Sequence, residues 1–171
     1  INNEFIKLIQ NFMNNALKLK DITIVIVSYK SKNKVLNILK KTKDLCKFII
    51  IENSEDINLK EEISQSFNKN IKVILSKNIG YGNGVNLASK YVKTRYFLAF
   101  GPDINPISLF DLNEFLFYAK KIKKFGALGP RYIKNKTNKN LTQTNKEKKF
   151  SKINCLSGAV LLFDRNVFKK L

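Results

Sequence analysis

A turn rich in glycine and asparagine, from Lys77 to Asn86, is the stretch of the sequence best suited to binding a ligand. It reads KNIGYGNGVN and lies between an apolar run of strand length and a helix-like segment. Gly80, Gly82 and Gly84 let a ligand approach the backbone closely, and the N-terminus of a helix attracts anions. The turn therefore favours phosphate as a ligand, although the same glycines also suit a tight strand-to-helix connection that binds nothing.

A carboxylate with metal-ligating chemistry, Asp103, follows the next apolar run and lies between Pro102 and Pro106. Mg²⁺ and Mn²⁺ take a few oxygen ligands from a protein and leave the other positions to phosphate and water. In that role Asp103 would hold a metal ion that in turn binds a diphosphate. An aspartate that caps the next turn or helix would occupy the same place, and the residues alone leave both interpretations open.

Polar residues also end the two earlier apolar runs, as Ser28-Tyr29 and Glu52-Asn53. A carboxylate or an amide at these points can accept a hydrogen bond from the N–H group of a base, and the ring of Tyr29 offers a stacking surface. Ordinary turn chemistry explains the same residue types. These polar residues are stronger candidates as a group than individually, because each of them follows a predicted strand.

The elements that would position these residues alternate between strands and helices. Apolar runs predict strands at 22–28, 48–51, 71–76, 96–100, 126–130 and 157–163. Amphipathic segments predict helices at 32–43, 58–67, 82–92 and 108–124, with a short helix at the end. This alternation is typical of right-handed βαβ units and a mainly parallel sheet. In such an α/β fold, ligands bind outside the carboxyl ends of the strands, where the candidate residues fall.

Two further segments complete the predicted organisation. Residues 1–20 have apolar side chains at three- and four-residue spacing, which predicts an N-terminal amphipathic helix, packed on the domain or a partner or lying on a membrane surface. Residues 135–149 contain a single leucine among lysine, asparagine, threonine and glutamine, which predicts a long loop. We therefore expect a helical segment at 1–20 and one domain at 21–171.

Composition excludes several classes of function. The 171 residues contain no histidine and two cysteines without metal-ligand spacing, which excludes histidine catalysis and zinc sites and suggests reduced thiols in the cytoplasm. No apolar stretch is long enough to span a bilayer. The net charge of +19 comes almost entirely from lysine. We interpret it as a solvated surface with compositional bias, and the alternatives are contact with anionic lipid or with nucleic acid.

Six motifs give the sequence a resemblance to a known family. VIVSYKS, IIIENSED, SKNIGYGNGVNLA, FLAFGPDINP, GALGPRY and SGAVLLFDR occur in the order and approximate spacing of family 2 glycosyltransferases with the GT-A fold. The rhamnosyltransferase-like branch, whose fourth strand ends in an N-P-D-type motif, is most similar. The resemblance covers Ile22 to about Arg165. It implies a Rossmann-like sheet flanked by helices, and inverting, metal-dependent transfer of a sugar from a nucleotide-sugar donor to a polysaccharide or lipid-linked acceptor.

The resemblance also implies roles for individual residues. The family has T-Y-N after the first strand, D-N after the second, where the acid binds the base, and N-L-G-x-G-x-x-x-N after the third. The matching positions, which would bind the donor, are Ser28, Tyr29, Glu52, Asn53, Asn78, Gly80, Gly82 and Asn86. Asp103 matches the last aspartate of the family's D-x-D-like motif, which holds Mg²⁺ or Mn²⁺ together with the donor diphosphate.

The sequence departs from the family pattern at several positions. Lys30 replaces an asparagine, Glu52 replaces an aspartate, and Gly101 stands at the first position of the D-x-D-like triplet. The family's acidic pair that supplies the catalytic base would follow Leu171, so the sequence identifies no base. Asp111 and Asp164 do not lie in the family's base motif.

The sequence therefore leaves three competing hypotheses for the function. The first is a glycosyltransferase whose partners are a nucleotide-sugar donor, a glycan or lipid-linked acceptor and the inner face of the cell membrane. The second is a catalytically inactive nucleotide-sugar-binding domain of the same fold. The third is a basic nucleic-acid-binding protein, which we rank last because no recognition helix or aromatic RNA-binding motif is visible.

Overall fold

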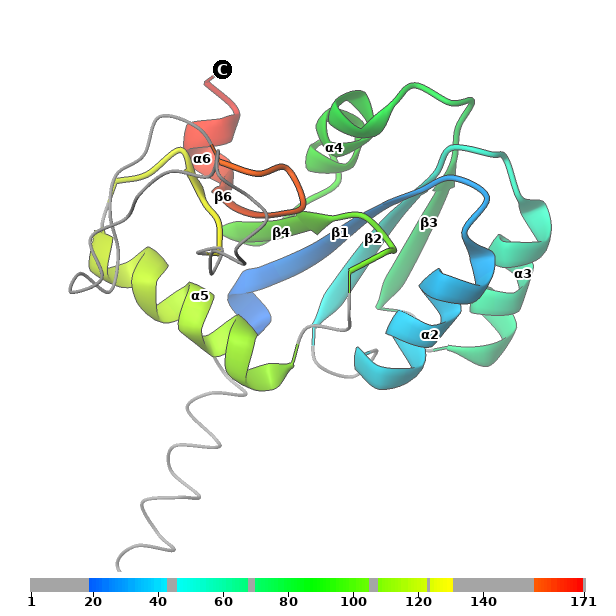
Figure 1. Ribbon diagram of the computed structural model, residues 1–171, viewed down its shortest axis with the longest axis horizontal. Coiled ribbons are helices and arrows are strands. Elements are labelled where there is room, and N and C mark those ends of the chain that lie inside the picture. The colour runs from blue at the N-terminus through cyan, green and yellow to red at the C-terminus, as the bar shows by residue number, and fades with distance from the viewer. Residues whose placement is uncertain are drawn as a thin grey trace, which may run out of the picture.

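The protein is built on one mixed sheet, which the computed structural model shows in Figure 1. The structure describes residues 19–42, 46–67, 70–104, 108–122, 124–130 and 156–170. The six strands lie in the order β3-β2-β1-β4-β6-β5. Their bounds are β1 Ile22–Ser28, β2 Lys47–Glu52, β3 Ile71–Leu75, β4 Tyr96–Phe100, β5 Ala127–Leu128 and β6 Val160–Asp164. Strands β1 to β4 pair in parallel, as predicted, whereas β6 runs antiparallel to both β4 and β5.

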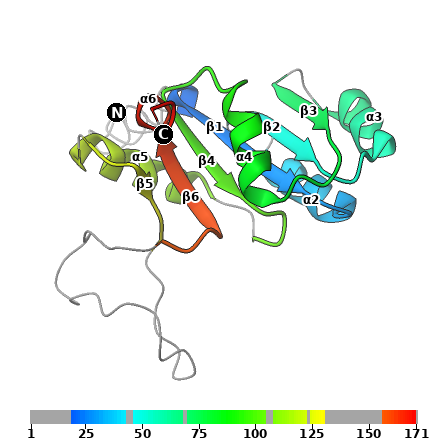
Figure 2. The ribbon, with the colours of Figure 1, turned by 90° about the horizontal axis from the view of Figure 1, so that it is seen from above.

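Helices cover both faces of this sheet. Their bounds are η1 Leu19–Asp21, α2 Lys32–Thr42, α3 Ile57–Ser66, α4 Tyr81–Ser89, α5 Leu109–Ile122 and α6 Arg165–Phe168. Figure 1 shows α2, α3 and α5 on one side and α4 and α6 on the other, and Figure 2 shows α4 lying over β1 and β2. Within the described ranges, every helix falls short of the length and apolar character that crossing a bilayer requires.

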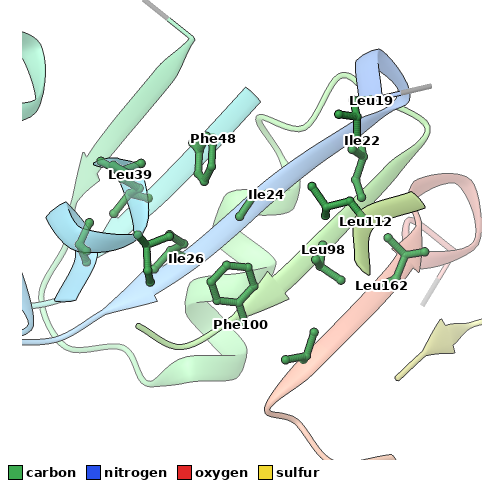
Figure 3. Packing of buried hydrophobic residues seen from close by; sticks show 14 of the residues in the cluster. Leu19, Ile22, Ile24, Ile26, Leu39, Phe48, Leu98, Phe100, Leu112 and Leu162 are labelled. Atoms are coloured by element: carbon green, nitrogen blue, oxygen red, sulfur yellow. The ribbon is translucent and has the colours of Figure 1, made fainter. Parts of the chain in front are cut away.

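The central strands form because nearly every residue in them is apolar and many are β-branched. All of β1 and β4 is buried, which suits strands covered on both faces. Alternate residues separate into two clusters: Ile24 and Ile26 face α2 and α5, whereas Val25 and Val27 face α4. Figure 3 shows the larger cluster, in which Leu39 of α2 and Leu112 of α5 meet the sheet. Each fully buried aliphatic side chain contributes about 1.5–3 kcal/mol.

The described elements confirm most of the predicted ones, with corrections at the carboxyl-terminal end. The strand expected at 157–163 begins at Val160, because Ser157 Oγ accepts a hydrogen bond from the N–H of Ala159 in a preceding turn. The strand expected at 126–130 is reduced to two residues. Residues 1–18 of the predicted N-terminal helix, the predicted loop at 135–149, and Cys155 lie outside the described residues. Cys46 is a free thiol.

Candidate functional site

The polar residues predicted to act together lie along one edge of the sheet. Parallel register pairs Ser28 with Glu52 and Glu52 with Leu75, so the carboxyl ends of β1, β2 and β3 are level. The backbone N–H of Asn53 donates to the Ser28 carbonyl (2.8 Å), and the N–H of Ser76 donates to the Glu52 carbonyl (2.9 Å). The loops that follow these strands meet at the upper right of Figure 1. We call segments 28–30, 52–54, 76–82 and 101–103 the site edge.

Three buried polar atoms at the site edge lack hydrogen-bond partners. They are Ser28 Oγ, Glu52 Oε2 and Asn53 Oδ1, and their residues are 0%, 1% and 3% exposed. A buried polar group without a partner costs about 1–3 kcal/mol, and such groups are uncommon in folded proteins. Half of the six buried side-chain atoms that lack a partner among the described residues therefore lie at two adjoining strand ends.

The Glu52 carboxylate is held on one side by Ser54, a residue that the sequence reasoning missed. Glu52 Oε1 accepts hydrogen bonds from the backbone N–H of Ser54 (2.9 Å) and from its hydroxyl. The Ser54 hydroxyl in turn accepts from the backbone N–H of Lys30 (3.1 Å). Lys30 has a φ of +49°, a left-handed conformation that asparagine tolerates better than lysine. The sequence signal that could have identified Ser54 is its spacing, because a serine two residues after an acidic residue can hydrogen-bond to that residue's carboxylate.

The glycine turn is ordered by its own polar groups. Asn78 Oδ1 accepts from the N–H of Gly80 (3.1 Å), and the Gly80 carbonyl accepts from the N–H of Gly84 (3.0 Å) and from Asn53 Nδ2 (3.4 Å). Gly80 adopts φ 78° and ψ 170°, which is available to glycine but rarely to other residues. The turn is thereby joined to the end of β2.

The start of helix α4 is open to a ligand. Gly80 is the N-cap residue of α4, and it has no side chain that could accept hydrogen bonds from the first N–H groups of the helix. These N–H groups are therefore available to an anion. A Cβ added at Gly82 would meet no heavy atom within 4 Å, whereas one added at Gly84 would lie 2.6 Å from Val27 Cγ1. Gly84 thus serves the packing of α4 on β1, and Gly82 borders open space. Asn86 is exposed on the same helix.

Asp103 lies in the turn after β4 with its carboxylate exposed. The N–H of Ile104 donates to the Gly101 carbonyl (3.3 Å), and a Cβ at Gly101 would lie 2.7 Å from Asp103 Oδ1, so the carboxylate folds back over Gly101. Helix α5 is capped by Ser108, whose hydroxyl oxygen accepts from the backbone N–H of Asp111 (3.2 Å) and whose own N–H donates to Asp111 Oδ2 (2.9 Å). Asp103 therefore does not cap that helix.

Tyr81, the first residue of α4, interacts electrostatically with the Asp103 carboxylate. Burial and, after it, the negative charge of Asp103 raise the pKa of the Tyr81 phenol to about 12. The β4 turn and the start of α4 are thus close enough to interact electrostatically. Sequence reasoning missed Tyr81, which is 36% exposed, because an aromatic residue between glycines carries no distinct signal.

Other predicted residues lie at the rim or have structural roles. Tyr29 is 47% exposed, and Lys30 Nζ lies 5.4 Å from its ring centroid. Asp164 caps α6 through the N–H of Asn166 (2.8 Å) and forms an ion pair with Arg95 (3.7 Å). Within the part of the chain that the structure describes, no group of three or more acidic or cysteine side chains could hold a metal ion. The metal-binding role of Asp103 stays a prediction.

Comparison with solved structures identifies the fold. No family model and no curated protein matches the sequence. Staphylococcus aureus TarS (residues 1–349) superposes with a TM-score of 0.62 at 15% identity, covering 88% of this chain and 48% of that one. The same TarS fragment in complex with UDP gives a TM-score of 0.57 at 16% identity, with the same coverage. A Desulfovibrio desulfuricans protein described as a nucleotide-diphospho-sugar transferase gives 0.54 at 12% identity, covering 87% of this chain and 65% of that one.

These likenesses confirm the GT-A fold, a mostly parallel sheet flanked by helices that the sequence predicted. The chain spans about half the length of the TarS fragment that it matches.

Proposed function

We propose that this chain is the donor-binding part of a transferase that moves a sugar from a nucleotide-sugar donor to a polysaccharide or lipid-linked acceptor. The observation that carries the proposal is the set of unpartnered buried atoms of Ser28, Glu52 and Asn53, located at the strand ends where this fold binds ligands. The likeness to TarS, one structure of which contains UDP, supports a nucleotide as the ligand. The proposal includes the family 2, rhamnosyltransferase-like assignment that the motifs suggested.

Each part of the site edge has a task in this proposal. Glu52 and Asn53 accept hydrogen bonds from the base, beside the exposed ring of Tyr29. The N–H groups at the start of α4, next to Gly82, hold the diphosphate, because a helix N-terminus carries a partial positive charge. An acceptor hydroxyl then displaces the diphosphate from the anomeric carbon with inversion, after losing its proton to a base that we expect outside the site edge.

The residues present fit a divalent metal ion shared with the donor. The Asp103 carboxylate makes no hydrogen bond or ion pair to any other described residue, and it is exposed, so it is free to coordinate. One or two carboxylates with substrate phosphates commonly hold Mg²⁺ in phosphate-transfer sites. Asp103 would hold the ion, which when bound would supply positive charge against the departing diphosphate.

Isothermal titration calorimetry with UDP-, dTDP- and GDP-sugars, with and without Mn²⁺, tests the proposal. We expect metal-dependent binding of at least one donor, and loss of that dependence in Asp103→Ala with little change in melting temperature. Glu114→Gln is a matched control, because Glu114 is an exposed acid on α5 away from the site edge. Absence of metal-dependent binding by every donor would refute the proposal, and a large drop in the melting temperature of Asp103→Ala would make it a structural residue.

The alternative, a binding domain without activity, is favoured by Gly101, which leaves one carboxylate where the family has two. Release of free sugar from a bound donor distinguishes the two. Metal-dependent hydrolysis above the rate without protein supports the enzyme, and tight binding without any hydrolysis or transfer supports the binding domain.

A further inference from the structure

Exposed cations gather at the edge of the sheet opposite the site edge. Because β1 to β4 are parallel, the segments that enter these strands and the ends of α2 and α4 all lie at their amino ends. Register places the end of α5 and the segment before β5 there as well, since Ala127 and Phe97 both pair with Phe163. We call the exposed cations of these segments the basic edge: Lys20, Lys40, Lys41, Lys47, Lys90, Lys93, Arg95, Lys120, Lys121 and Lys124.

Most acidic side chains of the described residues lie away from the basic edge. Of the described acids, only Asp21 and Asp164 lie at the amino ends of β1 to β4, and Asp164 is paired with Arg95 at 3.7 Å. The remaining described acids precede or lie within α3 and α5, or belong to the site edge. The positive charge of the described chain is therefore polarised along the strand direction, which a uniform bias toward lysine does not produce.

Helix stabilisation accounts for part of this distribution. Lysines in the last turn of a helix, such as Lys40, Lys41 and Lys120, interact favourably with the helix dipole. Lys47 opens a strand, and Lys93 and Lys124 lie in connections, where that explanation fails. Helix stabilisation therefore does not explain why Lys47, Lys93 and Lys124 lie on this edge.

The chemistry of the surface favours a lipid bilayer over nucleic acid. Its cations are lysines apart from Arg95, whose guanidinium is engaged with Asp164 and lies 5.0 Å from the Tyr96 ring. Lysine acts as a point charge, which suits a diffuse anionic surface more than the paired contacts that arginine makes to bases. On α5, Phe117 is 59% exposed with Lys121 Nζ 5.9 Å from its ring, and exposed apolar side chains beside lysines are a feature of helices that lie on membrane surfaces.

We propose that the basic edge binds an anionic lipid surface peripherally. The seven residues of β1 span about 23 Å at roughly 3.3 Å per residue. The bound orientation therefore keeps the site edge about that far from the headgroups and open to its ligands. The inference does not depend on the proposed sugar transfer.

Sedimentation with phosphatidylcholine vesicles, with and without 30% phosphatidylglycerol, tests this surface. Two triple variants remove equal charge: Lys41, Lys47 and Lys124 to glutamine on the basic edge, and Lys34, Lys60 and Lys77 to glutamine elsewhere. At about 1 kcal/mol per lysine near an anionic membrane, each loss weakens binding about fivefold, so the first triple variant should lose about 100-fold and the second only a few-fold. Far-UV circular dichroism confirms that both variants fold.

Three results would overturn the proposal. One is absence of binding to anionic vesicles at 0.15 M salt, and another is equal loss in the two triple variants, which would indicate net charge without a defined surface. The third is displacement of vesicles by a short single-stranded oligonucleotide that binds more tightly, which would make the basic edge a nucleic-acid surface. Phe117→Ser adds an independent readout, since it should weaken vesicle binding without changing the charge.

Discussion

Two glycines of the same turn should respond in opposite ways to alanine. Gly80 has φ 78° and ψ 170°, where a Cβ is strained whatever the space around it. Alanine there should cost about 1–3 kcal/mol. Gly82 lies in the first turn of α4 with no heavy atom within 4 Å of a Cβ, so alanine should instead stabilise the helix by about 0.5–1 kcal/mol.

Thermal unfolding measures both changes. For a chain of this size, 1 kcal/mol moves the melting temperature by about 2–4 °C. Gly80→Ala should therefore lower it by about 2–12 °C, and Gly82→Ala should raise it by about 1–4 °C. Calorimetric titration of the same proteins with a nucleotide-sugar gives the second measurement. Gly82→Ala should weaken binding by tenfold or more even as it stabilises the fold, because in the proposed site its methyl group would stand where the diphosphate approaches.

The combination separates geometry from ligand binding. If Gly80→Ala is neutral, the backbone strain assigned to this turn is wrong. If Gly82→Ala raises the melting temperature and leaves donor affinity unchanged, then no ligand approaches Gly82 and the glycines serve the turn alone. A loss of stability in Gly82→Ala would refute the open space that the structure places there.

Three other changes test separate parts of the site edge. Lys30→Asn should raise the melting temperature by about 1–4 °C, because asparagine tolerates the φ of +49° better; a decrease would show that the lysine side chain has a role of its own. Ser28→Ala removes a buried hydroxyl without a partner, so thermal unfolding should show unchanged or greater stability while calorimetry shows weaker donor binding; a clear loss of stability would reveal a hydrogen bond within the fold. The pKa of Tyr81 is raised from 10.0 to about 12 in the folded chain, so the unfolded chain releases the phenol proton at lower pH than the folded chain does. The free energy of unfolding of the parent protein should therefore fall between pH 10 and 12, and that of Tyr81→Phe should fall less steeply. Parallel curves would place the phenol in solvent.

The sequence predicted the parallel part of the sheet closely because burial on both faces requires an unbroken apolar run. Strands β1 and β4 have the predicted bounds, and β3 ends one residue earlier than predicted. The direction of β6 was not predicted, since pairing direction depends on partners far along the chain. The same limit applies to Gly84, whose contact with Val27 joins two elements that the sequence separates.

The candidate site was predicted in part for a related reason. Strand ends could be placed from local patterns, so the positions of Ser28, Glu52, Asn53 and Asp103 after β1, β2 and β4 were predicted, and their binding roles stay predictions. Ser54 was missed because its role lies in a hydrogen bond to a neighbouring side chain, and serine in a turn has many uses. The role of Tyr81 depends on the distance between α4 and the β4 turn, which only the fold determines.

The unpartnered polar atoms explain why this edge differs from the rest of the core. Among the described residues, six buried side-chain atoms lack partners, and three of these belong to Ser28, Glu52 and Asn53. Folding alone would favour apolar residues at strand ends so fully enclosed, because each unsatisfied group costs about 1–3 kcal/mol. In the proposed function, a donor that supplied the missing hydrogen bonds would recover this cost. Donor binding should therefore stabilise this chain most where its own hydrogen bonding is least complete, at the ends of β1 and β2.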